Sequence, residues 1–208
     1  MNIAVFISGG GTTLRNLIAR SASEGLGGEL RLVISSRADA GGLKYAREAN
    51  LATFIVRKND FSSDEQYSQA MFSPCRDAGI DLVVMAGFLK HVLIPEDFHG
   101  RVINIHPSLI PSFCGAAMYG ARVHQAALDY GVKVSGCTVH FVNNEFDNGP
   151  IILQRVCEVR DDDTAESLAA RVFQLECEAL PAAIRRFTAG QLTIAGRRVL
   201  SRENGPQQ

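Results

Sequence analysis

The chain has 208 residues, of which 46% are hydrophobic and 21% charged, the balance of a globular protein rather than of a disordered or fibrous one. Its 21 basic and 22 acidic side chains leave a net charge of −1, which excludes a broad electrostatic attraction for nucleic acid or for an anionic membrane. A chain of this length can bury a substantial core without disulfides or a structural metal.

Short apolar runs alternate with helical patterns through the first half of the chain. Strands are predicted, in chain order, at residues 3–7, 30–34, 53–56, 81–86 and 102–105. Helices are predicted at the stretch that carries Leu14, Leu17 and Ile18, and at residues 42–49 and 64–78. Apolar strands that alternate with helices indicate a parallel sheet buried on both faces.

The pattern changes after Pro107. A loop at residues 108–120 leads to a predicted helix at 123–130, and two longer β-like runs at 134–142 and 151–159 flank the turn formers of residues 143–150. A last helix is predicted at residues 164–187, with Asp163 or Thr164 as its N-cap, followed by a frayed tail from Glu203.

These elements predict an α/β fold: a doubly wound, mostly parallel sheet with a Rossmann-like N-terminal half and a mixed C-terminal extension. We expect a single domain over residues 1–208, with an N-terminal half at 1–106 and a C-terminal half at 107–202.

Cysteine usage and hydropathy indicate a cytoplasmic protein. The cysteines are odd in number, widely spread and without a Cys-x-x-Cys pair, so we expect neither a disulfide framework nor a zinc site. The apolar run at residues 3–7 is too short for a signal peptide. No apolar segment approaches the ~20 residues that cross a bilayer.

Ligands of an open α/β sheet bind beyond the carboxyl ends of its strands. Three chemically rich segments are predicted there: the glycine run after the first strand, residues 85–90 and residues 104–107. Their coincidence predicts a binding site at this edge.

The glycine run, Gly9-Gly10-Gly11-Thr12-Thr13, connects a strand to a helix. Backbone N–H groups at a helix N-terminus suit a phosphate, which makes Gly11, Thr12 and Thr13 candidate ligands, although a tight turn without a ligand would have the same pattern. Leu14 stands where a dinucleotide fingerprint has its third glycine. Arg37 could hold a 2′-phosphate, which keeps an NADP-linked enzyme as a minor alternative.

Asn104 and His106 are two residues apart on a predicted strand, so their side chains should project from one face at its carboxyl end. An amide donor beside an imidazole suits a reaction that develops charge on a carbonyl oxygen. Asp147, in a turn, is a candidate partner that would raise the pKa of His106, although an aspartate in a turn is often only a turn former.

On spacing alone, an ordinary structural role is expected for the remaining histidines, although His140 could lie near the site. These histidines are His91, His99, His124 and His140.

The chain resembles the glycinamide ribonucleotide formyltransferases, folate-dependent transformylases of purine synthesis, over nearly its whole length. The matching motifs are Ile7-Ser8-Gly9-x-Gly11, Ala86-Gly87-Phe88, Asn104-Ile105-His106-Pro107-Ser108-Leu109-x-Pro111, Thr138-Val139-His140-Phe141-Val142 and Asp147-x-Gly149-Pro150-Ile151-Ile152-Leu153-Gln154.

The resemblance implies the formyltransferase fold and transfer of a formyl group from 10-formyltetrahydrofolate, without a metal, to the amine of glycinamide ribonucleotide. Asn104 and His106 would then stabilise the oxyanion, and Asp147 would raise the pKa of His106. Gly11, Thr12 and Thr13 would hold the substrate phosphate, and Glu176 its ribose hydroxyls.

The folate would contact two segments and Asn104, according to the same resemblance. The residues concerned are Leu89, Lys90, His91, Val92, Asn104, Asn143, Asn144, Glu145 and Phe146. The resemblance implies small-molecule partners, neither nucleic acid nor membrane, and a monomer or a homodimer.

Three features depart from the family pattern. Thr13 replaces a frequent asparagine, and Asp64 stands where some members carry an arginine associated with folate. The loop at residues 113–120 is longer than in the shortest members, and either folds over the site or is a simple insertion.

Other functions remain alternatives. Formyltetrahydrofolate deformylases carry an additional N-terminal domain and methionyl-tRNA formyltransferases a C-terminal one, so chain length disfavours both. A formyltetrahydrofolate hydrolase activity stays open because water can replace the amine. A non-catalytic nucleotide or folate sensor is disfavoured by the joint presence of Asn104, His106 and Asp147.

Overall fold

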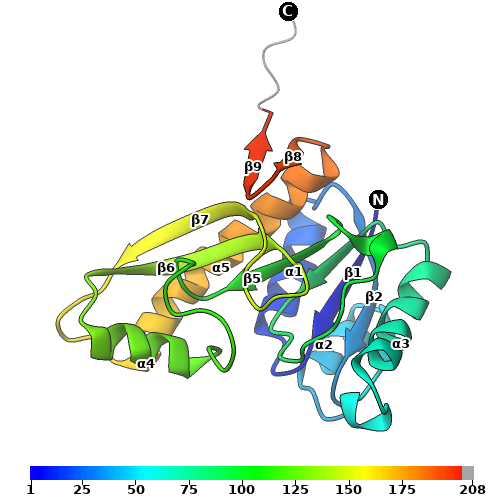
Figure 1. Cartoon of the computed structure of the whole chain (residues 1–208), viewed down its shortest axis with the longest axis horizontal. Coiled ribbons are helices and arrows are strands. Elements are labelled where there is room, and N and C mark those ends of the chain that lie inside the picture. The colour runs from blue at the N-terminus through cyan, green and yellow to red at the C-terminus, as the bar shows by residue number, and fades with distance from the viewer. Residues whose placement is uncertain (203–208) are drawn as a thin grey trace, which may run out of the picture. The chain divides into compact units, whose positions relative to one another are not determined.

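The computed structural model describes residues 1–202, and the frayed tail predicted from Glu203 lies outside the described residues. The chain forms two compact units (Figure 1). The first comprises Met1–Asn104 and Val142–Asn144, and the second comprises Ile105–Phe141 and the chain from Glu145 onwards. The chain first passes from the first unit to the second within β5 (Val102–His106), between Asn104 and Ile105.

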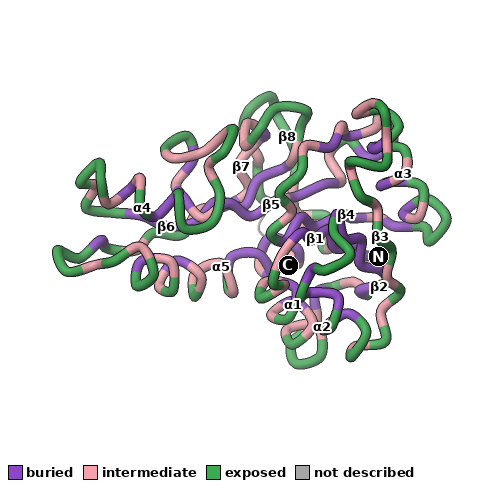
Figure 2. The backbone as a smooth tube through the Cα atoms, turned by 90° about the horizontal axis from the view of Figure 1, so that it is seen from below, coloured by how far each residue is buried: buried purple, intermediate pink, exposed green. Residues whose placement is uncertain are grey.

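The first unit contains a parallel sheet in the strand order β3-β2-β1-β4-β5. Its strands are β1 (Asn2–Ile7), β2 (Glu29–Ser35), β3 (Ala52–Ile55), β4 (Leu82–Met85) and the start of β5. These bounds lie close to the predicted ones. The strands β1 and β4 are buried almost throughout, as Figure 2 shows, whereas the edge strand β3 is largely exposed.

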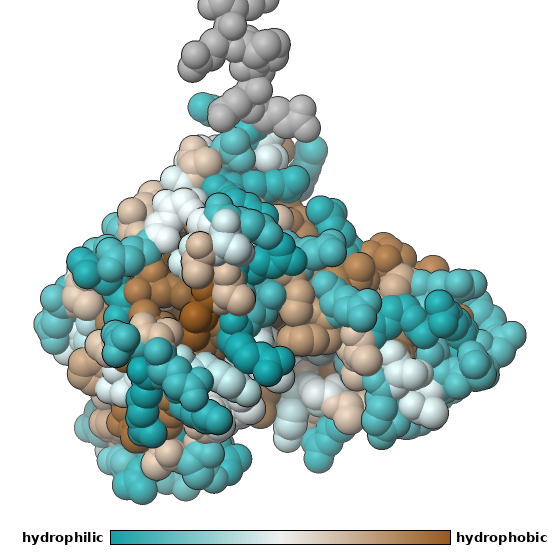
Figure 3. All heavy atoms as spheres, turned by 180° about the vertical axis from the view of Figure 1, so that it is seen from behind, coloured by the Kyte–Doolittle hydropathy of each residue, from teal (hydrophilic) through white to brown (hydrophobic). Residues whose placement is uncertain are grey.

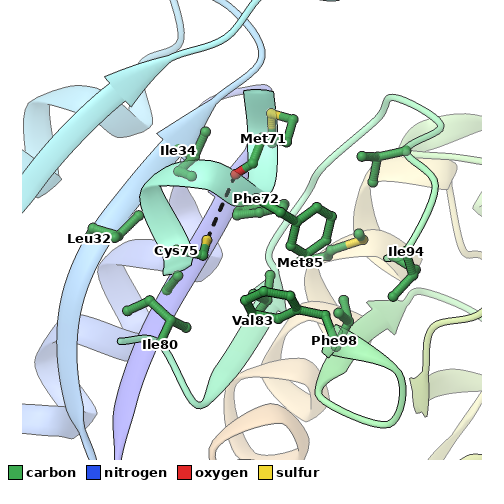
Figure 4. Close-up of a cluster of buried hydrophobic side chains, with 14 of the residues drawn as sticks. Leu32, Ile34, Met71, Phe72, Cys75, Ile80, Val83, Met85, Ile94 and Phe98 are labelled. Atoms are coloured by element: carbon green, nitrogen blue, oxygen red, sulfur yellow. Dashed lines mark hydrogen bonds between the residues drawn. The ribbon is translucent and has the colours of Figure 1, made fainter. Parts of the chain in front are cut away.

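Helices cover both faces of this sheet, which confirms the doubly wound prediction. They are α1 (Thr12–Ser23), α2 (Gly42–Glu48) and α3 (Asp64–Asp77), with short 3-10 turns η1 (Lys58–Asp60) and η2 (Glu96–Phe98). The ring of Phe6 on β1 packs against Phe72 of α3. Phe72 and Val83 of β4 belong to the same buried cluster, which Figure 4 shows. Helices α1 and α2 contact each other.

The second unit contains a mixed sheet in the order β6-β7-β9-β8. Strand β6 (Val134–Phe141) pairs antiparallel with β7 (Ile151–Glu158), which pairs parallel with β9 (Arg198–Ser201), and β8 (Leu192–Ala195) completes a hairpin with β9. This hairpin is absent from the sequence prediction, because two four-residue strands with mostly exposed side chains carry little periodic signal.

Two helices complete the second unit: α4 (Ala121–Tyr130) and α5 (Ala165–Thr188), which packs against β6, β7 and α4. The Thr164 side chain accepts a hydrogen bond from the backbone N–H of Ser167 in a capping box, so Thr164 is the N-cap. The parallel sheet with its mixed extension confirms the predicted fold class.

Polar side chains dominate the face of the molecule seen in Figure 3, and apolar ones show mainly where the surface is recessed. Among residues 1–202, no helix is long and apolar enough to cross a membrane.

Candidate active site

The glycine turn joins β1 to α1 in the first unit. Gly11 is the N-cap of α1 and adopts a left-handed conformation, with φ of 77°. A Cβ atom at Gly11 would lie 2.2 Å from the Cα of Gly42, so only glycine fits this turn. Thr12 and Thr13 are the first residues of the helix, and no described side chain caps it. Its first N–H groups therefore have the geometry that suits an anion.

Ser8 links the glycine turn to the loop after β4. The buried Ser8 hydroxyl lies 2.7 Å from the Ser36 hydroxyl and accepts a hydrogen bond of 2.9 Å from the backbone N–H of Leu89. The backbone N–H of Ser8 donates to the Gly87 carbonyl at 3.1 Å. The structure thus brings together two of the three predicted ligand segments. Sequence analysis did not identify Ser8 as the residue that connects them.

Two of the segments assigned to folate by resemblance also meet in the first unit. The backbone N–H of Ile94 donates to the Asn144 side chain at 2.7 Å, and His91 Nε2 lies 3.2 Å from the Asn144 carbonyl oxygen. Leu89 and Lys90 are exposed, whereas Val92 is buried.

The remaining members of this set are divided between the two units. Asn143 belongs to the first unit, and Glu145 and Phe146 belong to the second, where both are exposed. Glu145 accepts a hydrogen bond from the Asn148 side chain.

The second unit brings His106 and Asp147 together, although they are far apart in sequence. His106 Nδ1 lies 3.5 Å from Asp147 Oδ2, and both side chains are largely buried. Asp147 adopts a left-handed conformation with φ of 50°, which directs its carboxylate toward the histidine. The turn that sequence analysis regarded as ambiguous therefore positions a partner for His106.

The loop after His106 contributes two further backbone contacts. His106 Nε2 lies 2.9 Å from the Phe113 carbonyl oxygen, and the backbone N–H of Gly115 donates to Asp147 Oδ2 at 2.9 Å. Because a carbonyl oxygen can only accept, Nε2 carries a proton in this arrangement. A second proton would therefore bind at Nδ1, opposite the carboxylate. No sequence motif indicates that the Phe113 carbonyl and the Gly115 N–H contact His106 and Asp147.

Asp147 raises the pKa of His106, as expected from the sequence, but the net shift of that pKa is downward. Burial lowers its pKa, and the charge of Asp147 and the Phe113 carbonyl raise it by less, so the net shift is downward. Burial raises the pKa of Asp147, but His140, His106 and the Gly115 N–H together lower it by more. The ground state is therefore a neutral imidazole beside a carboxylate.

His140 lies close to Asp147. It is buried on β6, its Nε2 lies 3.7 Å from Asp147 Oδ1, and its Nδ1 lies 2.8 Å from the Phe141 carbonyl oxygen. His140 and His106 thus lie near different oxygens of the Asp147 carboxylate. His124 is also buried, on α4, where burial and the nearby His106 lower its pKa.

Asn104 and Glu176 complete the predicted set. Asn104 is half-buried on β5, where it pairs in register with Met85, and it belongs to the first unit. Glu176 is partly buried on α5 in the second unit, and burial raises its pKa to about 7. No group of three or more metal-ligating side chains occurs in the described part of the chain.

The fold and the site together define an α/β protein with a buried histidine–carboxylate pair, His106 and Asp147. Such a pair can take part in acid–base chemistry. A family model described as formyl transferase matches residues 1–184. The chain therefore belongs to the formyl transferase family.

Individual relatives agree with this assignment. The phosphoribosylglycinamide formyltransferase of Escherichia coli (strain K12) is 37% identical over 197 residues, which cover 93% of this chain and 90% of that protein. The trifunctional purine biosynthetic protein adenosine-3 of Gallus gallus is 36% identical over 196 residues, so the chain spans only 19% of that larger protein. The solved structure of glycinamide ribonucleotide transformylase 1 from Symbiobacterium toebii matches with a TM-score of 0.92 and 40% identity, covering 98% of this chain and 94% of that one.

Proposed function

We propose that the chain is a phosphoribosylglycinamide formyltransferase, which moves the formyl group of 10-formyltetrahydrofolate to the amine of N1-(5-phosphoribosyl)glycinamide in purine biosynthesis. The family match supports formyl transfer, and the names of full-length relatives support this acceptor. The observation that carries the proposal is the His106–Asp147 pair, because a buried imidazole held 3.5 Å from a carboxylate can gain and return a proton.

The proposed reaction begins when the substrate amine attacks the formyl carbon. The electron pair of the C=O bond moves to the oxygen, where the Asn104 amide and protonated His106 donate hydrogen bonds to the oxyanion. Asp147 stabilises the imidazolium form through its charge. When the intermediate collapses, the bond from carbon to the folate nitrogen breaks, and the proton lost by the amine reaches that nitrogen through His106.

His106 Nε2 must leave the Phe113 carbonyl before it can donate to the oxyanion, because one N–H cannot serve both acceptors fully. Uptake of a proton at Nδ1 would be coupled to the negative charge that develops on the substrate. Because its pKa is shifted downward, His106 is neutral at neutral pH before the reaction and has to take up this proton as the reaction proceeds.

The substrate contacts follow the same reasoning. Gly11, Thr12 and Thr13 would hold the phosphate through the N-terminus of α1. Glu176 would accept hydrogen bonds from the ribose hydroxyls, a role suited to a carboxyl group with few polar neighbours of its own. Its raised pKa would fall once hydroxyl donors bind the carboxylate.

The folate would be held by residues 89–92, by Asn104 and by residues 143–146. Backbone groups of such loops can bind the edge of a heteroaromatic ring. The proposal further includes a cytoplasmic monomer or homodimer, a single functional domain over residues 1–208, no metal requirement, and small-molecule partners only.

A spectroscopic assay of tetrahydrofolate release tests the proposal directly. Turnover should require both 10-formyltetrahydrofolate and glycinamide ribonucleotide. Equal release without the amine substrate would identify a hydrolase instead. Binding of either ligand without any release would identify a sensor, and tight NADPH binding would support an NADP-linked enzyme.

A further inference from the structure

Asp64 is the first residue of α3, and its carboxylate contacts two different groups of the first unit. Asp64 Oδ1 lies 3.0 Å from Lys58 Nζ, and Asp64 Oδ2 lies 3.5 Å from His91 Nδ1. Lys58 Nζ also donates to the His91 carbonyl at 3.4 Å. The three side chains thus form a closed set of contacts, which we call the Asp64 clasp (Lys58, Asp64 and His91).

The Asp64 clasp holds one side of the segment at residues 91–94. Next to it, the Ser68 hydroxyl of α3 donates to the Leu93 carbonyl at 2.7 Å. His91 of the clasp also contacts the segment at residues 142–144, because its Nε2 donates to the Asn144 carbonyl at 3.2 Å. Fixing the His91 ring therefore connects α3 to the segment at residues 142–144.

The other side of the segment is held by Asn144. Its side-chain oxygen accepts a hydrogen bond of 2.7 Å from the backbone N–H of Ile94. Val92 and Ile94 are buried, whereas Leu89 and Lys90 at the start of the loop are exposed. Residues 91–94 are thus held from both sides, whereas the Leu89 and Lys90 side chains are exposed, and binding residues are often found on loops positioned in this way.

Electrostatics explain why an acidic residue works at position 64. The carboxylate faces an ammonium group and an imidazole, and the Lys58 hydrogen bond is the main reason that the pKa of Asp64 lies below its usual value. An arginine there would meet Lys58 as a like charge and would remove the carboxylate that contacts His91 Nδ1. In this chain, the side chain at position 64 therefore makes contacts with Lys58 and His91 and presents no positive charge to a ligand.

We propose that Asp64 is a positioning residue for the folate co-substrate: by holding Lys58 and His91, it fixes residues 91–94 against Asn144. This inference rests on the proposed function, because it assumes that the loop at residues 89–92 binds folate. Asp64 itself does not touch the reacting atoms. Its loss should therefore weaken folate binding without slowing the chemical step.

The first test is the steady-state kinetics of Asp64→Ala. The KM for 10-formyltetrahydrofolate should rise about fivefold, the scale of losing a small network of partly exposed charged contacts. The turnover number and the KM for glycinamide ribonucleotide should each stay within about twofold of the wild type. Asp60→Ala is a matched control, because it removes an exposed ion pair with Arg57, and the contacts that define the Asp64 clasp do not involve the Asp60 side chain.

A double-mutant cycle separates the clasp from a general effect. Lys58→Ala and Asp64→Ala should not be additive, because either change opens the same set of contacts. Hydrogen exchange of the Ile94 amide gives a readout that needs no turnover, and its protection should fall in Asp64→Ala but not in the control.

The outcomes are distinct. An unchanged folate KM in a folded Asp64→Ala variant, or a fall in turnover with unchanged KM, overturns the positioning role. A lower folate KM in Asp64→Asn also overturns it, because that result means direct repulsion of the co-substrate by the carboxylate. If the wild type shows no formyl transfer, the proposed function fails, whereas the exchange measurement still decides whether the clasp holds the loop.

Discussion

Replacing Asp147 by asparagine isolates the electrostatic part of the proposed mechanism, because the side chain keeps its size and loses its charge. In the wild type the carboxylate lies 3.5 Å from His106 Nδ1 and is largely buried. At an effective dielectric of about 20, two unit charges at that separation interact by about 5 kcal/mol.

The realised effect is smaller, because Asp147 shares its charge with the Gly115 N–H and with His140. Opposite charges at such distances typically shift a pKa by about 1–3 units. Burial already holds the pKa of His106 below its ordinary value, and the aspartate opposes that effect. The variant should therefore lower the pKa of His106 further, because it removes the charge that opposes the effect of burial.

The sign of the kinetic effect follows from this shift. If neutral His106 accepts a proton during the reaction, activity falls at pH values below its pKa, which produces the acidic limb of the pH–rate profile. In Asp147→Asn this limb should move to lower pH. Turnover at neutral pH should fall at least about tenfold, because the imidazolium form loses its counter-charge.

The assay is kcat/KM for formyl transfer between pH 5 and 9, together with the NMR titration of the His106 ring. Asp161→Asn is the control, because Asp161 is exposed and pairs with Lys133 in the second unit, away from the histidine contacts. A profile with an unmoved acidic limb, combined with an unmoved NMR titration, would refute the coupling of the two residues.

Three further outcomes are expected. His106→Ala should reduce turnover at least ~10²-fold, and Asn104→Ala should cost a similar factor as an oxyanion donor, so near-normal rates in either variant contradict the assigned role. Gly11→Ala should destabilise the fold by at least about 2 kcal/mol in urea unfolding, because its Cβ would overlap backbone at 2.2 Å and its φ is 77°, whereas Gly9→Ala, which has open space, should be nearly neutral. The folded-state pKa of Glu176 is raised to about 7 by burial. The contribution of the protonated carboxyl group to the free energy of unfolding is therefore complete below the pKa of the unfolded state and is lost as the pH rises through 7. Glu176→Gln should therefore stabilise the protein by about 3 kcal/mol at pH 8 but little at pH 4, and a pH-independent effect would exclude burial as the cause.

Local sequence pattern was sufficient for most of the fold. The buried strands β1 and β4 are continuous apolar runs, and such runs can be satisfied only inside a sheet that is covered on both faces. The capping box at Thr164 and the glycine turn at Gly11 were also predictable, because each depends on residues close together in the chain. The β8–β9 hairpin was not, since its short strands have mostly exposed side chains.

For the site, the sequence determined which residue types were available, and the tertiary structure decided which of them meet. The spacing of Asn104 and His106 on one strand is a local property. The contact between His106 and Asp147 depends instead on a backbone conformation with positive φ at Asp147, for which aspartate has only a weak preference. No motif could reveal that the Phe113 carbonyl and the Gly115 N–H bond to this pair, because every residue carries such backbone groups. The pKa of His106 was likewise decided by folding, since burial of the ring outweighs the nearby charge, and burial is a property of the packed chain rather than of any segment of it.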